Sequence, residues 1–208
     1  MGPIQGTEQL PRGRHGLSRE QVVASQRTRM LTAMTAAVAR KGYAHTSVAD
    51  VIAGAGVSRE TFYEQFSSKE DCFLAAYDHG VRSVRRAVSN ALTEAPSDPA
   101  ERYSHALAAY LRTLSLDEGI ARTFNVEVYA AGPAAIARRM ALMDQFVEIT
   151  AGILEARTPE DRFACEALVA AISSLVTNRV GTGQTACLPS LHEPLMALVR
   201  RAVAAWRV

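Results

Sequence analysis

The chain has 208 residues, of which 48% are hydrophobic and 6% aromatic, and its formal net charge is +2. This length suits one large or two small domains with a sizeable core. Abundant alanine favours helices over sheets, no run approaches the roughly 20 apolar residues of a membrane span, and the start of the chain lacks the apolar core of a signal peptide. The three cysteines form no CxxC pair, which suggests a reducing cytoplasm.

The charge is unevenly distributed along the chain. Residues 1–90 carry 12 Lys and Arg against 8 Asp and Glu, a net charge of +4, whereas residues 91–208 carry 11 against 13, a net charge of −2. A basic excess in one part of a chain suits contact with the phosphates of a nucleic acid.

The first segment is a polar arm at residues 1–17, which has no hydrophobic periodicity and which we expect to be mobile. It contains Arg12-Gly13-Arg14, a narrow basic triplet similar to the core of an AT-hook. Such a triplet fits the minor groove of DNA. Similar triplets also occur in solvated tails, so both interpretations stay open.

A capping box formed by Ser18 and Gln21 predicts a helix over residues 18–41, which Gly42 ends. Two short helices are predicted next, at about 47–54 and 58–66, and the turn Ala55-Gly56-Val57 joins them. Apolar side chains hold this pair together, while polar side chains of the second helix point outward. The pattern is typical of a helix-turn-helix, which presents its second helix to the major groove.

The stretch from Gly42 to Asp71 resembles the DNA-binding signature of the tetracycline-repressor (TetR) family. The resemblance rests on Gly42-Tyr43, Thr46-Ser47-Val48, Asp50, Ala55-Gly56-Val57-Ser58, Thr61-Phe62-Tyr63, Phe66, Ser68-Lys69 and Glu70. Ile52 departs from it, because the family usually has Ala near the helix crossing, and we expect a slightly different crossing angle. The resemblance implies a DNA-binding domain at 18–90, a ligand-binding and dimerisation domain at 91–208, and no cofactor.

Nine residues are predicted to contact DNA: Thr46, Ser47, Ser58, Arg59, Thr61, Tyr63 and Lys69, with Arg12 and Arg14 of the arm. Arg59 is the only long donor on the exposed side of the second helix, and its guanidinium suits O6 and N7 of guanine. The resemblance implies phosphate contacts by Tyr63 and Lys69. A lysine at a helix N-terminus is a good anion site on physical grounds as well. Capping by Ser58 and packing of Tyr63 are structural alternatives that are compatible with DNA contact.

Six further helices complete an all-α architecture of about nine helices, without strands or internal repeats. Their cap signals are Asp98-Pro99 with Glu101, Thr158-Pro159 with Asp161, and Ser190 with Glu193. The turn-rich segment 94–99 is the predicted hinge between the domains. The six are predicted at 69–92, 99–115, 118–130, 133–156, 159–180 and 190–206.

The middle helices carry the candidate ligand pocket, although most of their apolar residues must be ordinary core. The candidates are Tyr110, Phe124, Glu127, Val128, Met140, Met143 and Phe146. Glu127 places a carboxylate in an apolar run, where an unpaired charge is costly. It could meet a cationic ligand, or it could pair with Arg122, Arg138 or Arg139.

The last two helices carry the candidate dimer interface. Its residues are Phe163, Leu168 and Leu175 on one helix, and Leu191, Leu195, Leu198 and Ala202 on the other. Two such faces meeting their symmetry mates would form a four-helix bundle. The alternative is that these stripes are core of their own chain. A dimer is favoured independently, because one helix-turn-helix reads too few base pairs.

The sequence lacks the motifs of an enzyme or a metal site. Its five histidines fall singly, and it has neither an HExxH motif, nor a phosphate-binding glycine-rich loop, nor a Gly-x-Ser-x-Gly elbow. We therefore expect a cytoplasmic, homodimeric regulator with no membrane contact. It would bind double-stranded operator DNA, most simply as a repressor that an unknown small-molecule effector releases from a palindrome. An activator of the same fold and an architectural DNA-binding protein are the alternatives.

Overall fold

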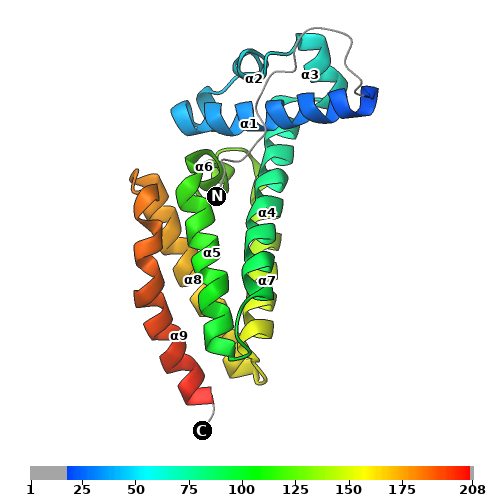
Figure 1. The fold of residues 1–208 in the computed structure, drawn as a ribbon. Coiled ribbons are helices and arrows are strands. Elements are labelled where there is room, and N and C mark those ends of the chain that lie inside the picture. The colour runs from blue at the N-terminus through cyan, green and yellow to red at the C-terminus, as the bar shows by residue number, and fades with distance from the viewer. Residues whose placement is uncertain (1–17, 207–208) are drawn as a thin grey trace. The chain divides into compact units, whose positions relative to one another are not determined.

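A computed structural model describes residues 18–206 of the chain, and over these residues it contains nine α-helices, two 3-10 helices and no strand (Figure 1). The all-α prediction is therefore confirmed. The elements are α1 (Arg19–His45), α2 (Val48–Ala55), α3 (Arg59–Gln65), α4 (Lys69–Thr93), α5 (Pro99–Leu116), α6 (Glu118–Asn125), η1 (Glu127–Tyr129), α7 (Pro133–Leu154), α8 (Pro159–Gly181), η2 (Thr185–Leu191) and α9 (His192–Trp206).

The helices begin and end where cap residues satisfy their free backbone groups. Ser18 and Gln21 form the expected capping box of α1, and Thr158 and Asp161 form that of α8. Gly42 has a φ of 77° and interrupts α1, so the regular part of that helix ends at the predicted position. The chain continues for one more turn before α2.

The chain divides into two compact units, and the boundary between them along the sequence lies between Ala76 and Tyr77, inside α4. The first unit contains α1, α2, α3 and the first two turns of α4. The second contains the rest of α4 and all later helices. The segment at residues 94–99 connects α4 to α5 inside the second unit, and a functional division at residue 90 stays a prediction.

In the first unit, α1 packs along α2 and provides half of the buried apolar residues. Met30, Met34 and Val38 of α1 are completely buried, as are Val51 of α2 and Phe62 of α3. This apolar contact holds the helix-turn-helix in one arrangement, because neither α2 nor α3 is long enough to be stable alone.

In the second unit, α5 packs against α7, α9 and η2, while α8 packs against α6 and α7. Leu111 and Leu114 of α5 and Met196 of α9 are almost fully buried. The unit is therefore a helical bundle, and its middle helix, α5, supplies much of the shared core.

The connections between the later helices differ from the prediction in two places. The helix predicted over 118–130 ends at Asn125, whose side-chain amide donates to the carbonyl of Ala121 at 2.9 Å, and the short 3-10 helix η1 follows. Such a local bond competes with helix continuation. Ser190 does not cap the last helix but donates to the carbonyl of Cys187 at 2.7 Å inside η2.

Two helical glycines allow a matched test of the packing in the second unit. A Cβ at Gly80 would lie 2.8 Å from Cε2 of Phe124, whose ring already packs against Tyr77 at a centroid distance of 4.7 Å. A Cβ at Gly152 would meet nothing within 4 Å. The two positions therefore differ in packing and share the same helical conformation.

We expect Gly80→Ala to lower the free energy of unfolding by about 1–3 kcal/mol through overpacking. Gly152→Ala should raise it by about 0.5–1 kcal/mol, because alanine loses less backbone entropy on folding. Urea denaturation followed by circular dichroism measures both. A Gly80→Ala protein as stable as the Gly152→Ala protein would show that Phe124 can move without cost.

Candidate DNA interface and ligand cavity

The exposed side of α3 presents Arg59 and Tyr63 to solvent. Phe62 is fully buried behind them, and its ring meets the Tyr63 ring edge-on at 5.3 Å. The guanidinium of Arg59 lies 5.4 Å from the centroid of the Tyr63 ring, and Tyr63 is 46% exposed. Both side chains are accessible to a partner that meets α3 from outside.

Ser58 and Thr61 combine capping with partial exposure. The Ser58 Oγ accepts the backbone N–H of Thr61 at 3.0 Å, and the two hydroxyl oxygens lie 2.9 Å apart. Ser58 is exposed and Thr61 is half-buried. The cap and a contact to DNA are compatible, because a hydroxyl oxygen has more than one hydrogen-bonding position.

Two arginines of α1 hold the ends of the short helices, and nothing in the sequence pattern indicated this role. Arg29 Nη1 donates to the carbonyl of Ala55 at the end of α2 at 2.5 Å. Arg27 Nη1 donates to the carbonyl of Gln65 at the end of α3 at 3.2 Å, and its guanidinium lies 4.4 Å from the centroid of the Phe66 ring. Cationic donors at helix C-termini satisfy free carbonyls and favour the helix dipole.

Thr46 requires a correction as a predicted DNA contact. It is only 2% exposed, and its hydroxyl donates to the carbonyl of Gly42 at 2.8 Å. It therefore closes the kink at the end of α1. Its neighbour Ser47 is exposed and caps α2, so it stays a candidate for phosphate contact.

Lys69 at the start of α4 is half-buried and already has a partner. Its Nζ donates to the carbonyl of Tyr43 at 3.0 Å and lies 4.1 Å from the centroid of the Tyr43 ring. This contact ties the beginning of α4 to the end of α1. An ammonium group has three N–H donors, so one bond to Tyr43 leaves capacity for a phosphate. Arg12 and Arg14 lie outside the described residues.

Asp50 is the centre of a small polar cluster at the start of α2. Its Oδ2 accepts the backbone N–H of Ser47 at 2.7 Å and lies 2.7 Å from Lys41 Nζ. The hydrogen bond from Lys41, followed by those from Ser47, lowers the pKa of the Asp50 carboxyl below its usual range. The cluster fixes the junction between α1 and α2.

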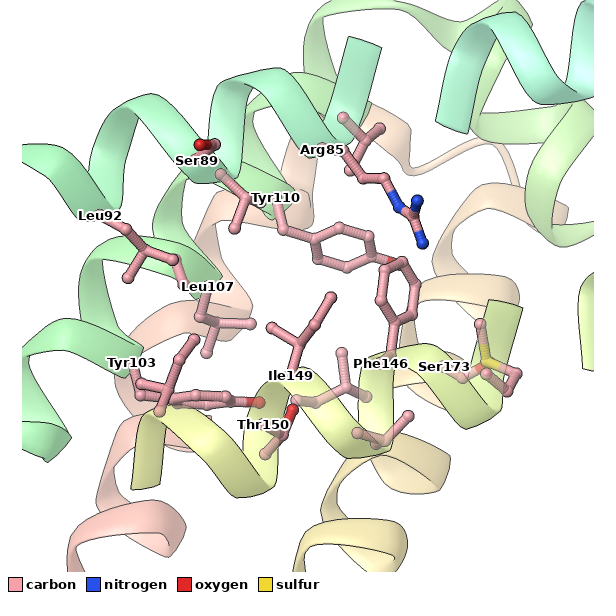
Figure 2. A pocket seen from close by; sticks show the side chains of 17 residues that line it. Arg85, Ser89, Leu92, Tyr103, Leu107, Tyr110, Phe146, Ile149, Thr150 and Ser173 are labelled. Atoms are coloured by element: carbon pink, nitrogen blue, oxygen red, sulfur yellow. The ribbon is translucent and has the colours of Figure 1, made fainter. Parts of the chain in front are cut away.

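A cavity of about 490 Å³ lies in the second unit between α4, α5, α7 and α8 (Figure 2). It is lined by 17 residues, and only Arg85, Ser89, Thr150 and Ser173 among them are neither apolar nor aromatic. Its volume is within the range of small-molecule sites, which are mostly apolar with a few placed polar groups. The cavity is therefore a candidate ligand site.

Three of the predicted ligand residues line this cavity: Tyr110, Met143 and Phe146. Val128 is completely buried core, and Met140 is 64% exposed on α7. Neither lines the cavity, because both lie on other sides of their helices. The second half of α4, which supplies Val84, Arg85, Val88, Ser89 and Leu92 to the lining, was not among the predicted ligand residues.

Phe124 and Glu127 also lie outside this cavity, which corrects the cationic-ligand hypothesis. Phe124 packs against Tyr77 and lines a separate small pocket of about 10 Å³. Glu127 is 7% exposed, and its Oε1 accepts from Arg122 Nη2 at 2.9 Å. The ion pair is one of the alternatives that the sequence left open, and it compensates the buried carboxylate.

The titratable groups around the cavity are neutral at physiological pH apart from arginine. Burial raises the pKa of Tyr77 and of Tyr110 to about 12, and burial also raises the pKa of Tyr103. Their hydroxyl groups therefore stay protonated and can donate hydrogen bonds. The one charged residue in the lining is Arg85, which donates to Gln145 Oε1.

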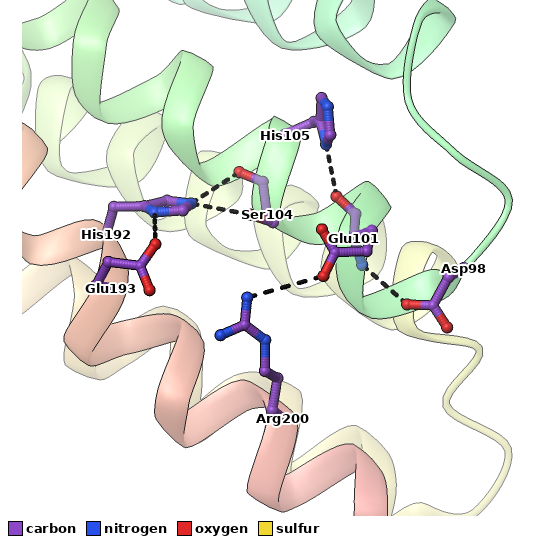
Figure 3. A network of polar contacts seen from close by, with 7 residues as sticks. All are labelled: Asp98, Glu101, Ser104, His105, His192, Glu193 and Arg200. Atoms are coloured by element: carbon purple, nitrogen blue, oxygen red, sulfur yellow. Dashed lines mark hydrogen bonds and ion pairs between the residues drawn. The ribbon is translucent and has the colours of Figure 1, made fainter.

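A polar network fastens α9 to α5 and fixes which side of α9 is buried (Figure 3). His192 Nε2 lies 3.0 Å from Ser104 Oγ, and Arg200 Nη2 lies 3.8 Å from Glu101 Oε1. Figure 3 shows these contacts running along one side of both helices. The apolar residues of α9 on the α5 side are consequently core of the same chain.

The predicted dimer residues divide into an exposed and a buried set. Phe163 and Leu175 of α8 are 70% and 41% exposed, and Leu198 of α9 is 53% exposed, while Leu168 and Ala202 are half-buried. Leu191 and Leu195 are 7% and 2% exposed. The last two are therefore corrected to core of their own chain, because η2 and α9 pack against α5.

Within the described residues, α8 is the one helix long and apolar enough to cross a membrane by length and composition alone. Only 28% of its apolar window is buried. Core helices of soluble proteins meet the same criterion, so the observation concerns the exposed apolar side of α8. That side is available to another apolar surface.

Comparison with known proteins identifies the family of the DNA-binding region. The model of the bacterial regulatory proteins of the tetR family matches residues 31–76, which run from α1 through α2 and α3 into α4. The chain is also 28% identical over 151 residues to the HTH-type transcriptional regulator EthR of Mycolicibacterium smegmatis, over 70% of this chain and 66% of that protein. Residues 31–76, which contain the helix-turn-helix, therefore match the DNA-binding region of the TetR family.

A second curated relative is the HTH-type transcriptional repressor DhaR of Mycobacterium sp.. It is 26% identical over 108 residues, which are 52% of this chain and 54% of that protein. The chain thus spans between half and two thirds of the length of these curated relatives. Both relatives are transcriptional regulators and not enzymes.

Solved structures of transcriptional regulators share the fold. The fatty acid degradation regulator FadR of Bacillus halodurans superimposes with a TM-score of 0.72 at 20% identity, over 83% of this chain and 93% of that one. FadR of Bacillus subtilis, in complex with stearoyl-CoA, gives 0.70 at 19% identity, over 82% and 96%. At these identities the likeness establishes the fold alone.

The Asp50 cluster makes a prediction about pH. Because the pKa of Asp50 is lowered in the folded state, its contribution to stability is present above the ordinary carboxyl pKa and is lost as the pH falls through the folded value. We expect Asp50→Asn to lower the melting temperature at neutral pH, and the difference from the native protein to shrink as the pH falls below about 4. Melting followed by circular dichroism across this range measures it.

The matched control for that series is Asp144→Asn, a change at an exposed aspartate of α7. It should leave the melting temperature unchanged at each pH. A difference between the native and the Asp50→Asn proteins that is constant from neutral to acid pH would contradict an ionised Asp50 as the source of the stabilisation.

Proposed function

We propose that the chain is a ligand-responsive transcriptional regulator that binds a palindromic operator as a homodimer, most simply as a repressor released by a small molecule. The observation that carries the proposal is α4. This single helix starts at Lys69, directly after the helix-turn-helix, and its second half lines the cavity. A ligand in the cavity and the recognition helix are therefore connected by one continuous helix.

On DNA, α3 enters the major groove with Arg59 available to a guanine edge and Tyr63 to the backbone. Ser47, Thr61 and Lys69 are the further candidates for phosphate contact. The exposed positions of Arg59 and Tyr63 and the match to a DNA-binding family support this arrangement. Two copies would read two half-sites one turn of B-DNA, about 34–36 Å, apart.

The homodimer forms through the exposed apolar sides of α8 and α9. Phe163, Leu175 and Leu198 are large, exposed and apolar, and such surfaces usually mark contact sites. Their mutual burial across a two-fold axis would give a four-helix arrangement. A homodimer of a DNA-binding regulator would work in the cytoplasm.

The effector is a mostly apolar small molecule held between α4, α5, α7 and α8. The apolar lining supports this, and so does the fold likeness to a regulator that was solved in complex with stearoyl-CoA. Ligand binding would move α4 and change the separation of the two recognition helices. The effector and the operator would then lower each other's affinity by the same factor.

The proposal is tested first at Arg59. DNA sequences selected from a random pool by the full chain define the preferred site, and fluorescence anisotropy measures the affinity for it. We expect Arg59→Ala to lose about 1–3 kcal/mol on that site and to discriminate less between bases at one position. Arg112→Ala, at an exposed arginine of α5, is the matched control and should bind like the native protein. Equal loss on selected and random DNA would contradict a base contact by Arg59.

The proposed interface is tested by charge insertion at exposed positions. We expect Leu175→Arg and Leu198→Arg to shift the protein to monomers in light scattering, because a charge would be buried unpaired at the interface. The monomers should keep the native circular dichroism, since neither position is core. Leu116→Arg is the control at a residue that is 75% exposed on α5. Dimers that persist in both interface variants would place the contact elsewhere.

A further inference from the structure

One buried charge in the second unit has no opposite charge beside it. Arg139 of α7 is 4% exposed. Its Nε donates to the hydroxyl of Tyr129 at 3.1 Å, and its Nη2 donates to Ser173 Oγ at 2.6 Å. Over residues 18–206, no carboxylate forms an ion pair with it. A buried guanidinium held only by neutral hydroxyls is costly.

Neighbouring arginines in the same unit do have carboxylate partners. Arg122 pairs with Glu127, and Arg138, the next residue on α7, pairs with Asp78. Arg138 is nevertheless far more exposed than Arg139, and a solvent-exposed charge needs a partner least. The residue that most needs an opposite charge is thus the one that lacks it.

Two tyrosines close to Arg139 supply further donors. The hydroxyl of Tyr77 is buried and lies within reach of the Arg139 side chain, which is the hydrogen-bond partner indicated for it among the described residues. The charge of Arg139 acts to lower the pKa of both Tyr77 and Tyr110, but burial outweighs it and raises both values to about 12. Both groups are therefore neutral donors next to a positive charge. An anion is the ligand that such a set accepts.

This donor set adjoins the inner wall of the cavity. Ser173 lines the cavity and also accepts from Arg139. Tyr110 and Phe146 line the cavity and also line a separate small pocket of about 10 Å³ that Arg139 lines. Their rings meet at a centroid distance of 6.0 Å, and Figure 2 shows both pointing into the same space. These two side chains therefore separate Arg139 from the cavity, and they would have to move for a ligand in the cavity to reach it.

We infer that Arg139 is an anion-binding residue at the inner end of the cavity, and that the effector is an amphipathic carboxylate. Its apolar part fills the cavity between α4, α5 and α7, and its carboxylate accepts hydrogen bonds from Arg139 and from the tyrosine hydroxyls. This inference rests on the proposed function and names the chemical class of the effector.

The chemistry of the site selects a carboxylate among anions. The pocket beside Arg139 has room for about one water-sized group, so the anion must be small and its entry requires the side chains of Tyr110 and Phe146 to move. A carboxylate is flat, carries one charge and matches the planar guanidinium fork. A phosphate ester is bulkier and brings a second negative charge, which one arginine does not compensate. Arg85 is the cationic side chain that lines the cavity itself, but it is exposed and already donates to Gln145.

The experiment compares saturated alkanoates, from octanoate to hexadecanoate, with the primary alcohols of the same chain lengths. Isothermal titration calorimetry measures their binding to the full chain at neutral pH. We expect at least one alkanoate to bind about tenfold or more tightly than its matching alcohol, since hydrogen bonds to charged groups contribute about 1.5–3 kcal/mol. If no alkanoate binds more tightly than its alcohol, the inference is overturned.

Four variants locate the site. Arg139→Met should abolish the preference for the alkanoate and leave alcohol binding unchanged. Tyr77→Phe removes one buried hydroxyl and keeps the ring that packs against Phe124, so it should fold normally and weaken alkanoate binding several-fold. Arg138→Met is the matched control and should retain the full preference. A preference that survives Arg139→Met, or that is lost on Arg85→Met instead, would place the anion elsewhere and overturn the inference.

Two further readouts separate this inference from its alternatives. If Arg139 is only a structural link between α7 and α8, Arg139→Met will lower the free energy of unfolding without ligand and keep the alkanoate preference. Release of the preferred DNA site is measured on the same samples. A protein that binds selected DNA and is released equally by alkanoate and alcohol keeps the proposed function and loses the anion site. A protein that binds alkanoate through Arg139 but binds no DNA keeps the anion site and loses the proposed function.

Discussion

The recognition helix exists because the rest of the first unit holds it in place. With seven residues, α3 is far shorter than the length at which an isolated helix is stable in water. Three contacts compensate for this. Phe62 is fully buried against the core, Ser58 caps the beginning of the helix, and Arg27 caps its end from α1. The exposed side of α3 can therefore carry Arg59 and Tyr63, which contribute little to folding, and can be devoted to recognition.

The same reasoning extends to α4. Its first residue, Lys69, donates a hydrogen bond to the carbonyl of Tyr43 at the end of α1. Movement of α4 at this point would therefore also move the helix-turn-helix. Its second half lines a cavity whose walls are mostly apolar side chains. Apolar contacts are non-directional and tolerate sliding, whereas the Lys69 bond is directional. In the proposed function, a ligand would displace the second half of α4, and the displacement would reach the helix-turn-helix through Lys69.

Local chemistry made much of the fold predictable from the sequence. The capping boxes at Ser18 and Thr158, the glycine at position 56 and the apolar clasp of the helix-turn-helix all act within a few residues, and the structure has them where the sequence indicates. Which residues of an apolar stripe are buried in the chain's own core could not be predicted from such local signals. Leu195 and Leu198 are three residues apart on α9, yet the first is core and the second is exposed. Only the position of α5 decides between them.

The partners of charged residues could not be predicted from the sequence either. The sequence places Glu127 near three arginines and cannot say which of them pairs with it, because α6, η1 and α7 must first be folded against each other. The structure assigns Arg122 to Glu127 and Asp78 to Arg138, and Arg139 then has only hydroxyl partners among the described residues. The sequence-based hypothesis had sought an unpaired carboxylate and a cationic ligand. The observed ion pairs reverse the expected charge of the ligand, because the side chain left without an opposite charge is an arginine.

An uncompensated charge has a consequence for how a ligand could control the protein. A ligand shifts a conformational equilibrium only by the difference between its affinities for the two states. In the inference about Arg139, a carboxylate would compensate the buried guanidinium only in the arrangement in which Arg139 reaches the cavity. If the inference about Arg139 holds, the charge therefore supplies the differential affinity, while the apolar cavity supplies binding that is similar in both states. Total affinity and switching would then reside in different parts of the same ligand.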